Sequence, residues 1–404
     1  MQTCLNLPPV SESLQGEAKH EVGAKTMAEF LNADLIGVQG GAARLQTPAL
    51  VVDLDILDTN IAAMTAYANQ CGIGLRPHAK THKCVEISKR QIAAGALGIC
   101  VAKLGEAEAQ ADGGIDSVLI TSPVVSEAGI RRLVTLNGRL GELITVCDNA
   151  EVSLRLSAAA QAMGKRLKVL VDIDPGLGRT GVLPGEQAYD LVRRVAAAPG
   201  LEYVGLQCYA GQVQHLESAN ERRTASLAVL AELRRFCGGL DDLGLMPKIV
   251  SGGGTGTFDI DPDARTLTEL QVGSYVFMDR QYNEVWEKTG GQAPFATSLF
   301  VQATVISANR DGLATTDAGY KSFATDAGPP QLIAGAPEGA SYFFFGDEQG
   351  GIFYSGATKL VPGQAVGCIV PHCDPTVNLY DCLHAVRGDT LEAVWHIEGR
   401  GRSA

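Results

Sequence analysis

Residues 168–176 read KVLVDIDPG, a short apolar run that ends in Asp, Pro and Gly. It follows an Ala- and Leu-rich stretch of helical period at residues 150–167. The Asp, Pro and Gly at its end are residues that favour a turn after a strand. A strand that is apolar on both faces is typical of a parallel sheet that is covered on both sides. The stretch therefore predicts a buried parallel strand that is preceded by a helix.

The same pattern recurs on both sides of this strand. Seven further short apolar runs occupy residues 73–80, 98–103, 117–125, 143–149, 203–211, 248–256 and 269–279. Helical stretches such as residues 220–236 separate them. Eight strands that alternate with helices over roughly 230 residues predict an N-terminal (β/α)8 TIM-like barrel. An open, doubly wound sheet is the alternative, because periodicity does not reveal whether a sheet closes.

The pattern changes after about residue 290. The later segments are short alternating strands that are separated by Gly, Pro, Asp and Asn. They predict a C-terminal antiparallel β domain at residues 291–404, after a barrel at 46–290 and an N-terminal extension at 1–45. The strand-like residues 47–55 are a candidate to join the β domain.

Composition narrows the class of partner. The chain of 404 residues has 33 Lys and Arg against 45 Asp and Glu, a net charge of −12. This balance argues against nucleic acid and anionic membranes as partners. No run approaches the roughly 18 apolar residues of a membrane span, and the first residues do not read as a secretory signal. Ten cysteines without a CxxC pair indicate reduced thiols, so we expect a cytoplasmic protein.

Polar residues follow the predicted strands, at the end of a barrel where active sites lie. They include Lys80, Ser122, Asp148, Asp174 and Tyr209. A lysine that is partly desolvated there has a lowered pKa and can form a Schiff base with an aldehyde. A solvated loop lysine is the alternative.

A glycine-rich turn, SGGGTGT at residues 251–257, follows the seventh predicted strand. Glycines allow backbone N–H groups to approach an anion, and barrels commonly bind phosphate at this position. A turn without a ligand is the alternative. A phosphate site together with Lys80 suggests pyridoxal 5'-phosphate, which carries both an aldehyde and a phosphate.

Six motifs in the same order carry a resemblance to a known family. They are PHAKTHK (77–83), DIDPGLGRTGV (172–182), LQCYAGQVQH (206–215), SGGGTGT (251–257), ELQVGSYVFMD (269–279) and PHCDPTVNLYD (371–381). From about Thr47 to Gly401 the chain resembles the D-threonine aldolase/D-serine dehydratase family. This family consists of pyridoxal-phosphate enzymes with an alanine-racemase-like fold. The resemblance implies a barrel followed by a β domain, and head-to-tail homodimers.

The resemblance also implies roles for individual residues. Lys80 matches the lysine that binds the cofactor aldehyde, and Arg179 matches the arginine at the cofactor's phenolic oxygen. Gln271 aligns near the pyridine nitrogen, and Tyr209 and His215 match polar residues of the substrate side. The phosphate positions of the family correspond to Gly253, Gly254, Thr255, Gly273 and Tyr275.

The final motif matches the family's metal site. His372 and Asp374 are two apart, a spacing that places both side chains on one face if the segment is a strand. An imidazole and a carboxylate suit Mn²⁺ or Mg²⁺, and Zn²⁺ remains possible. Members that resemble D-serine dehydratase have a cysteine at the second position, so Asp374 favours the aldolase. Cys373 would replace it if the register shifted by one residue.

Two departures from the family pattern affect the choice of reaction. CVAK at residues 100–103 is closer to the dehydratase-like branch, and Gln349 stands where a histidine is frequent. The first weakens the assignment as an aldolase, and the second concerns a substrate contact. Neither affects the cofactor.

These features predict cleavage of a β-hydroxy-D-amino acid to glycine and an aldehyde. His215 or a metal-bound water would take the hydroxyl proton. The alternatives are a D-serine or 3-hydroxy-D-aspartate dehydratase and a 3-hydroxy-D-aspartate aldolase. A non-catalytic pyridoxal-phosphate carrier is a further alternative, but carriers of that kind lack the β domain.

Overall fold

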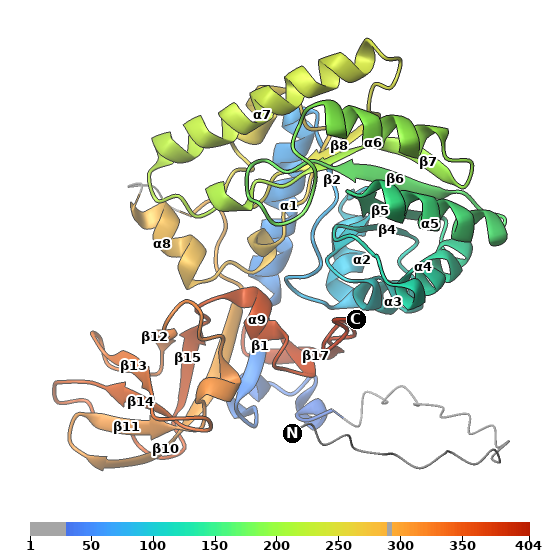
Figure 1. Ribbon diagram of the computed structural model, residues 1–404. Helices are drawn as coiled ribbons and strands as arrows, with labels where there is room; N and C mark the ends of the chain where they lie inside the picture. The colour runs from blue at the N-terminus through green and yellow to red at the C-terminus, as the bar shows by residue number, and fades with distance from the viewer. Residues whose placement is uncertain (1–29, 289–292) are drawn as a thin grey trace, which may run out of the picture.

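The computed structural model describes residues 30–288 and 293–404, which form a barrel and a second, mostly antiparallel sheet (Figure 1). Eight strands form the first sheet, and every pairing among them is parallel. They are β2 (Gly74–Leu75), β3 (Ile99–Val101), β4 (Ser117–Ile120), β5 (Glu142–Cys147), β6 (Leu167–Asp172), β7 (Leu201–Cys208), β8 (Ile249–Gly252) and β9 (Glu269–Leu270).

The first sheet closes on itself. Its order is β2-β9-β8-β7-β6-β5-β4-β3, and a parallel bridge between His78 and Cys100 joins its two ends. The amide of Ala79 donates to the carbonyl of Cys100 at 2.7 Å, and the amide of Cys100 donates to the carbonyl of Pro77 at 2.8 Å. The predicted (β/α)8 fold is confirmed, and the open, doubly wound alternative is wrong.

Helices surround the barrel. They are α1 (Leu54–Cys71), α2 (Val85–Ala93), α3 (Leu104–Asp112), α4 (Glu127–Arg139), α5 (Ala150–Ala162), α6 (Glu186–Ala197), α7 (Ala219–Asp241) and α8 (Arg280–Lys288). Local sequence determines where several of them begin. The side chain of Asn149, for example, accepts hydrogen bonds from the amides of Glu151 and Val152 and so caps α5.

Alternate residues of each strand face opposite sides of the barrel wall. Val169 and Val171 of β6 belong to the main core with the helices, whereas Leu170 belongs to a smaller buried cluster. The members of that cluster all come from barrel strands, so the cluster fills the barrel interior. Buried Arg76 and Glu269 also lie within the ring, with 3.0 Å between Nε and Oε1.

The first and last barrel strands are shorter than the sequence predicts. The run at 73–80 is a strand at Gly74–Leu75, and Pro77 further along it has no amide hydrogen to donate. The run at 269–279 is a strand at Glu269–Leu270 and then turns into a 3-10 helix at Ser274–Val276. The expectation that residues 273–275 lie on a strand is therefore wrong.

The second sheet has nine strands. They are β1 (Ala49–Asp53), β10 (Leu299–Arg310), β11 (Leu313–Thr316), β12 (Gln331–Ala334), β13 (Ser341–Phe344), β14 (Gly350–Phe353), β15 (Ala365–Ile369), β16 (Cys382–Arg387) and β17 (Thr390–His396). β1 pairs antiparallel with β10 and parallel with β16, so a strand that precedes the barrel completes the sheet.

The beginning of the chain packs against this sheet. Leu35 and Leu45 form a buried cluster with Val51, Leu391 and Val394, while the neighbouring residues of β1 join the main core. Residues 1–29 of the predicted N-terminal extension lie outside the described residues.

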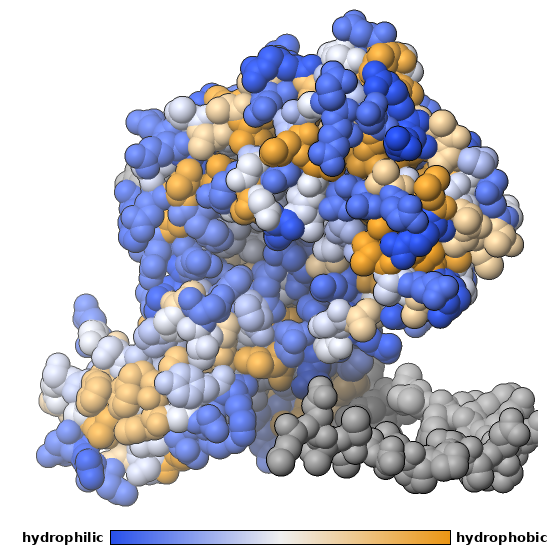
Figure 2. All heavy atoms as spheres, viewed as in Figure 1, coloured by the Kyte–Doolittle hydropathy of each residue, from blue (hydrophilic) through white to orange (hydrophobic). Residues whose placement is uncertain are grey.

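The two sheets meet beside a short helix, α9 (Cys373–Val377), which lies between the second sheet and the barrel (Figure 1). Figure 2 shows polar surface around the hollow between the two parts and apolar surface over β13 and β14. Within residues 30–288 and 293–404, every helix is too short or too polar to cross a bilayer.

Candidate active site

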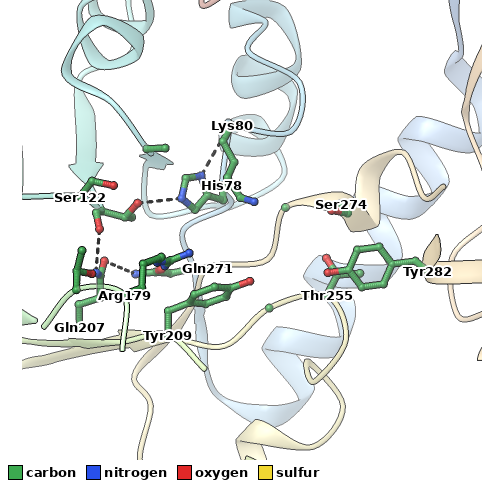
Figure 3. Close-up of a pocket in the computed structure, with 15 residues that line it drawn as sticks. His78, Lys80, Ser122, Arg179, Gln207, Tyr209, Thr255, Gln271, Ser274 and Tyr282 are labelled. Atoms are coloured by element: carbon green, nitrogen blue, oxygen red, sulfur yellow. Dashed lines mark hydrogen bonds between the residues drawn. The ribbon is translucent and has the colours of Figure 1, made fainter. Parts of the chain in front are cut away.

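A cavity of about 230 Å³ lies at the carboxyl ends of the barrel strands (Figure 3). Most strands contribute to its wall, as the fold predicts. Its lining residues are His78, Lys80, Ala102, Thr121, Ser122, Arg179, Thr180, Gln207, Tyr209, Gly254, Thr255, Gln271, Gly273, Ser274 and Tyr282.

Lys80 stands in the turn that follows the first barrel strand and faces this cavity. Its side chain is 43% exposed, and Nζ lies 2.9 Å from Oδ1 of Asp374 on α9. One salt bridge therefore joins the barrel to the second sheet at the mouth of the cavity.

The charge state of Lys80 differs from the sequence-based expectation. The negative charge of Asp374 raises the pKa of Lys80, and this effect outweighs the opposing effect of burial. Burial opposes ionisation of Asp374, but the charge and hydrogen bond of Lys80 lower its pKa. The predicted decrease in the pKa of Lys80 is wrong for this state of the protein, because the sequence could not place a carboxylate beside the amine.

The glycine-rich turn forms one wall of the cavity. A Cβ on Gly254 would lie 2.5 Å from Oε1 of Gln214, and one on Gly273 would lie 2.6 Å from Oγ1 of Thr81. Gly253 has φ +71°, which favours glycine. The absence of side chains at Gly254 and Gly273 leaves backbone exposed to a ligand.

The predicted phosphate residues divide into two groups. Gly254, Thr255 and Gly273 line the cavity, whereas Gly253 and Tyr275 do not. Tyr275 is 1% exposed, its hydroxyl accepts a hydrogen bond from Gln91 at 3.1 Å, and its amide donates to Oγ1 of Thr255 at 3.1 Å. Its side chain therefore supports the wall from behind.

Aromatic and cationic groups line the opposite wall. The guanidinium of Arg179 lies 5.4 Å from the ring centroid of Tyr209. Such a contact holds the cation over the ring face. Both residues were predicted from the sequence.

Several residues that line the cavity were not predicted from the sequence, among them His78, Gln207 and Tyr282. Buried His78 lies two residues before Lys80, and its Nε2 is 3.0 Å from Oγ1 of Thr121. Burial, and then the charge of Lys80, lowers its pKa. Gln207 stands within an apolar strand run, and Tyr282 lies in α8. The strand-end position of Gln207 was a usable signal, whereas Tyr282 offered none.

The predicted metal ligands occupy a helix start and not a strand. His372 is the N-cap residue of α9, and Asp374 lies in its first turn. Nε2 of His372 is 4.0 Å from Oδ2 of Asp374. The strand geometry is therefore wrong, although the two side chains still lie close together.

The surroundings of this pair are acidic and contain no preformed metal cage. Nδ1 of His372 lies 2.6 Å from Oδ2 of Asp326, and Cys373 is fully buried between the two predicted ligands. Within the part of the chain that the structure describes, no group of three or more His, Cys, Asp or Glu residues is arranged to hold a metal ion.

His215 lies at the edge of the cavity and not in its wall. It is exposed, and its ring centroid is 4.6 Å from that of Tyr282, which does line the cavity. Desolvation lowers the pKa of His215, and the positive charges of His372 and Lys80 lower it further. His215 is thus an available proton acceptor at neutral pH.

Comparison with protein families matches both parts of the chain. The family described as "Alanine racemase, N-terminal domain" matches residues 52–281, and the family described as "Putative serine dehydratase domain" matches residues 298–386. The matched segments correspond to the barrel and to most of the second sheet.

Two curated proteins are similar over most of their length. The 3-hydroxy-D-aspartate aldolase of Paracoccus denitrificans (strain Pd 1222) is 38% identical over 372 residues, which are 89% of this chain and 93% of the relative. The D-threonine aldolase of an Arthrobacter species is 38% identical over 364 residues, which are 89% of this chain and 94% of the relative.

Solved structures of an aldolase and a dehydratase have a fold similar to that of this chain. The D-threonine aldolase of Filomicrobium marinum has a TM-score of 0.83 and 36% identity, over 89% of this chain and 97% of the other. The D-threo-3-hydroxyaspartate dehydratase of Delftia sp. HT23 has a TM-score of 0.78 and 25% identity, over 88% of this chain and 98% of the other. A cysteine-to-alanine variant of a D-threo-3-hydroxyaspartate dehydratase, described as a metal-free form, has a TM-score of 0.78 and 25% identity.

Proposed function

Since the chain belongs to the D-threonine aldolase/D-serine dehydratase family, with its alanine-racemase-like barrel, we propose that it cleaves β-hydroxy-D-amino acids to glycine and an aldehyde. It is a pyridoxal-phosphate-dependent lyase. The observation that carries the proposal is the position of Lys80. Its amine faces the cavity, close to a glycine wall and to the carboxylate of Asp374.

The residues of the cavity fit pyridoxal phosphate. Lys80 would hold the aldehyde, and Gly254, Thr255 and Gly273 would hold the phosphate, because a Cβ at either glycine would crowd the wall. Arg179 would contact the phenolic oxygen. When bound, the cofactor supplies an electron sink for the bond that breaks at Cα. Tyr275 supports this cradle from behind through its amide hydrogen bond to Oγ1 of Thr255.

The second sheet would supply a metal site. His372 and Asp374 would hold a divalent ion, Mn²⁺ or Mg²⁺ by preference with Zn²⁺ possible, because one imidazole and one carboxylate form a fairly hard donor set. A metal there supplies Lewis acidity next to the substrate hydroxyl. The structure of a cysteine-to-alanine variant of a D-threo-3-hydroxyaspartate dehydratase is described as a metal-free form, which supports a metal site in members of this fold.

The protein's own groups would move the proton. His215 accepts the β-hydroxyl proton, because its lowered pKa keeps the ring neutral near pH 7. Tyr209, under the guanidinium of Arg179, orients the substrate side of the cavity. The cofactor cavity and the proposed metal site can act on the same substrate, because they lie next to each other. The salt bridge between Lys80 and Asp374 places the barrel lysine in contact with the second domain.

Dehydration is the second candidate reaction. A dehydratase relative shares the fold, but the relatives at 38% identity are named aldolases. Asp374 in place of a cysteine also favours the aldolase. The relatives are named as enzymes, and this argues against a non-catalytic carrier.

A product assay tests the proposal. Purified protein would be incubated with D-threonine, D-serine or 3-hydroxy-D-aspartate, with and without Mn²⁺ and with EDTA. We expect glycine and an aldehyde, formed faster with metal. Ammonia and a keto acid would instead show a dehydratase, and cofactor binding without any product would show a carrier. The preferred substrate among the three would separate a D-threonine aldolase from a 3-hydroxy-D-aspartate aldolase.

We propose in addition that the protein is a cytoplasmic homodimer. Buried cysteines such as Cys84, Cys100 and Cys147 are free thiols, which fits a reducing compartment. The family fold supports a head-to-tail pair. Sedimentation velocity of the purified protein would give the mass of a dimer if this is correct.

A further inference from the structure

Two buried glutamines form a hydrogen-bonded pair in the cavity wall (Figure 3). Gln207 and Gln271 are 3% and 4% exposed, and both line the cavity. Nε2 of Gln271 donates to Oε1 of Gln207 at 3.2 Å. The direction of this bond depends on what each amide contacts next.

Gln207 has one possible orientation. Its Nε2 contacts the backbone carbonyl of Thr121 at 3.0 Å and Oδ1 of Asp172 at 2.9 Å. A backbone carbonyl can only accept, so the nitrogen of the amide must face it. Both Nε2 hydrogens are then used, and Oε1 of Gln207 is left to accept from Gln271.

Gln271 is oriented from its other side as well. Its Nε2 contacts Oγ of Ser251 at 2.9 Å, and the Ser251 hydroxyl donates to Oε1 of Glu269 at 2.7 Å. That carboxylate is paired with Arg76, with 3.0 Å between Nε and Oε1. Ser251 has donated its hydrogen, so it can only accept from Gln271.

The two sides together determine what Gln271 offers to a ligand. If the amide of Gln271 were reversed, its own oxygen would face two other acceptors, Oε1 of Gln207 and the hydroxyl oxygen of Ser251. Such contacts between acceptors are repulsive. In the observed orientation both hydrogens of Nε2 are used within the wall. No residue in the described part of the chain donates to Oε1 of Gln271. The group that Gln271 presents to the cavity is therefore a hydrogen-bond acceptor.

We propose that Oε1 of Gln271 accepts a hydrogen bond from the protonated ring nitrogen of bound pyridoxal phosphate, and that Gln207 is the positioning residue that keeps this acceptor in place. The inference rests on the proposed function, since it concerns the same cofactor. The ring takes its proton from solvent. An unprotonated ring nitrogen would set its lone pair against the lone pair of Oε1, and burial makes such an unpaired acceptor costly.

Ring protonation matters for the reaction because a positive ring nitrogen withdraws electrons more strongly. Gln271 would thus strengthen the electron sink through hydrogen bonding to the ring nitrogen. An arginine in this place would do the opposite, since a guanidinium can only donate.

The direct test is ¹⁵N NMR of the protein loaded with pyridoxal phosphate labelled at the ring nitrogen. We expect the resonance at the protonated position near neutral pH. Gln271→Leu should move it toward the unprotonated position, and Gln207→Leu should move it in the same direction. Gln161→Leu, at an exposed glutamine on α5, should leave it unchanged. An unprotonated resonance in the unaltered protein would overturn the inference.

A second measurement needs no substitution. The unaltered protein would be titrated with pyridoxal phosphate and with the analogue that has CH in place of the ring nitrogen. We expect the analogue to bind roughly tenfold to a hundredfold more weakly, because it leaves a buried acceptor unpaired. Equal or tighter binding of the analogue would overturn the inference but leave the proposed function intact. Failure to bind either compound would overturn the proposed function and the inference together.

Discussion

Replacement of Asp374 by asparagine should make the protein bind its cofactor faster and cleave its substrate more slowly. Asp374 holds the ammonium of Lys80 at 2.9 Å, and its charge is the main cause of the raised pKa of that lysine. The neutral amine is the form that attacks an aldehyde. A carboxylate that holds Lys80 in the protonated form therefore slows loading of the cofactor.

The expected size follows from the contact. A hydrogen bond between charged groups contributes about 1.5–3 kcal/mol. The Lys80 side chain is 43% exposed, so solvent screens its interaction with Asp374. We therefore take an interaction free energy of about 1.4 kcal/mol, just below this range. This corresponds to roughly one pKa unit, and so to a roughly tenfold larger fraction of neutral amine at pH 7.

The assay follows the absorbance of pyridoxal phosphate after it is mixed with cofactor-free protein in EDTA. We expect Asp374→Asn to load about tenfold faster at pH 7, with its rate-against-pH curve moved to lower pH. A raised pKa keeps an amine protonated to higher pH. The loading rate of the unaltered protein should therefore still increase as the pH is raised beyond 7. In the presence of Mn²⁺, the cleavage activity of the variant should be lower than that of the unaltered protein by at least tenfold to a hundredfold. Substitutions of residues around a metal typically reduce activity by this factor.

The matched control is Asp326→Asn. Asp326 contacts His372 at 2.6 Å, and it is not among the groups that shift the pKa of Lys80. This control removes the same charge from the same region and should load at the rate of the unaltered protein. Equal loading by Asp374→Asn and the unaltered protein would refute the reasoning, as would equal acceleration by both variants.

Three further predictions concern the lysine, the glycine wall and a buried carboxyl group. Lys80→Ala should lose the visible absorbance of bound cofactor in a spectrum of the purified protein, whereas Lys89→Ala, at an exposed lysine, should keep it. Gly273→Ala should weaken cofactor binding in a fluorescence titration, because its Cβ would lie 2.6 Å from a threonine oxygen. The control Gly238→Ala should leave cofactor binding unchanged. Urea unfolding should show that this control stabilises the protein by about 0.5–1 kcal/mol, since Gly238 lies in α7. Burial raises the pKa of Asp261 from 3.8 to about 6, so the folded protein holds this proton at pH values where the unfolded chain has released it. Stability should therefore fall by up to about 3 kcal/mol between pH 4 and pH 6, and Asp261→Asn should show a smaller slope of unfolding free energy against pH; an unchanged slope would contradict this.

Local patterns explain why much of the fold could be predicted. Alternating apolar runs and helical stretches reveal a parallel sheet, since each element must bury one face or both. Lys80 and the glycines at 254 and 273 could be identified as candidates because the carboxyl ends of barrel strands converge, so a residue's place in the pattern predicts its place in space. The six ordered motifs extended that prediction to the family.

Local patterns could not predict the features that depend on contacts between distant residues. The i and i+2 spacing of His372 and Asp374 suggested a strand, but the segment begins a helix, and either geometry can keep such a pair together. The pKa of Lys80 was predicted in the wrong direction, because its ion-pair partner lies 294 positions away, in the helix α9 beside the second sheet.

The sequence by itself determined the barrel, the added β domain and the lysine that faces its strand ends, because these follow from periodicities within each segment. The tertiary structure decided the charge state of that lysine and which atom of Gln271 faces the cavity. The physical reason is that protonation and amide orientation depend on neighbouring donors, acceptors and charges, and here folding brings those neighbours from strands and loops that are far apart along the chain.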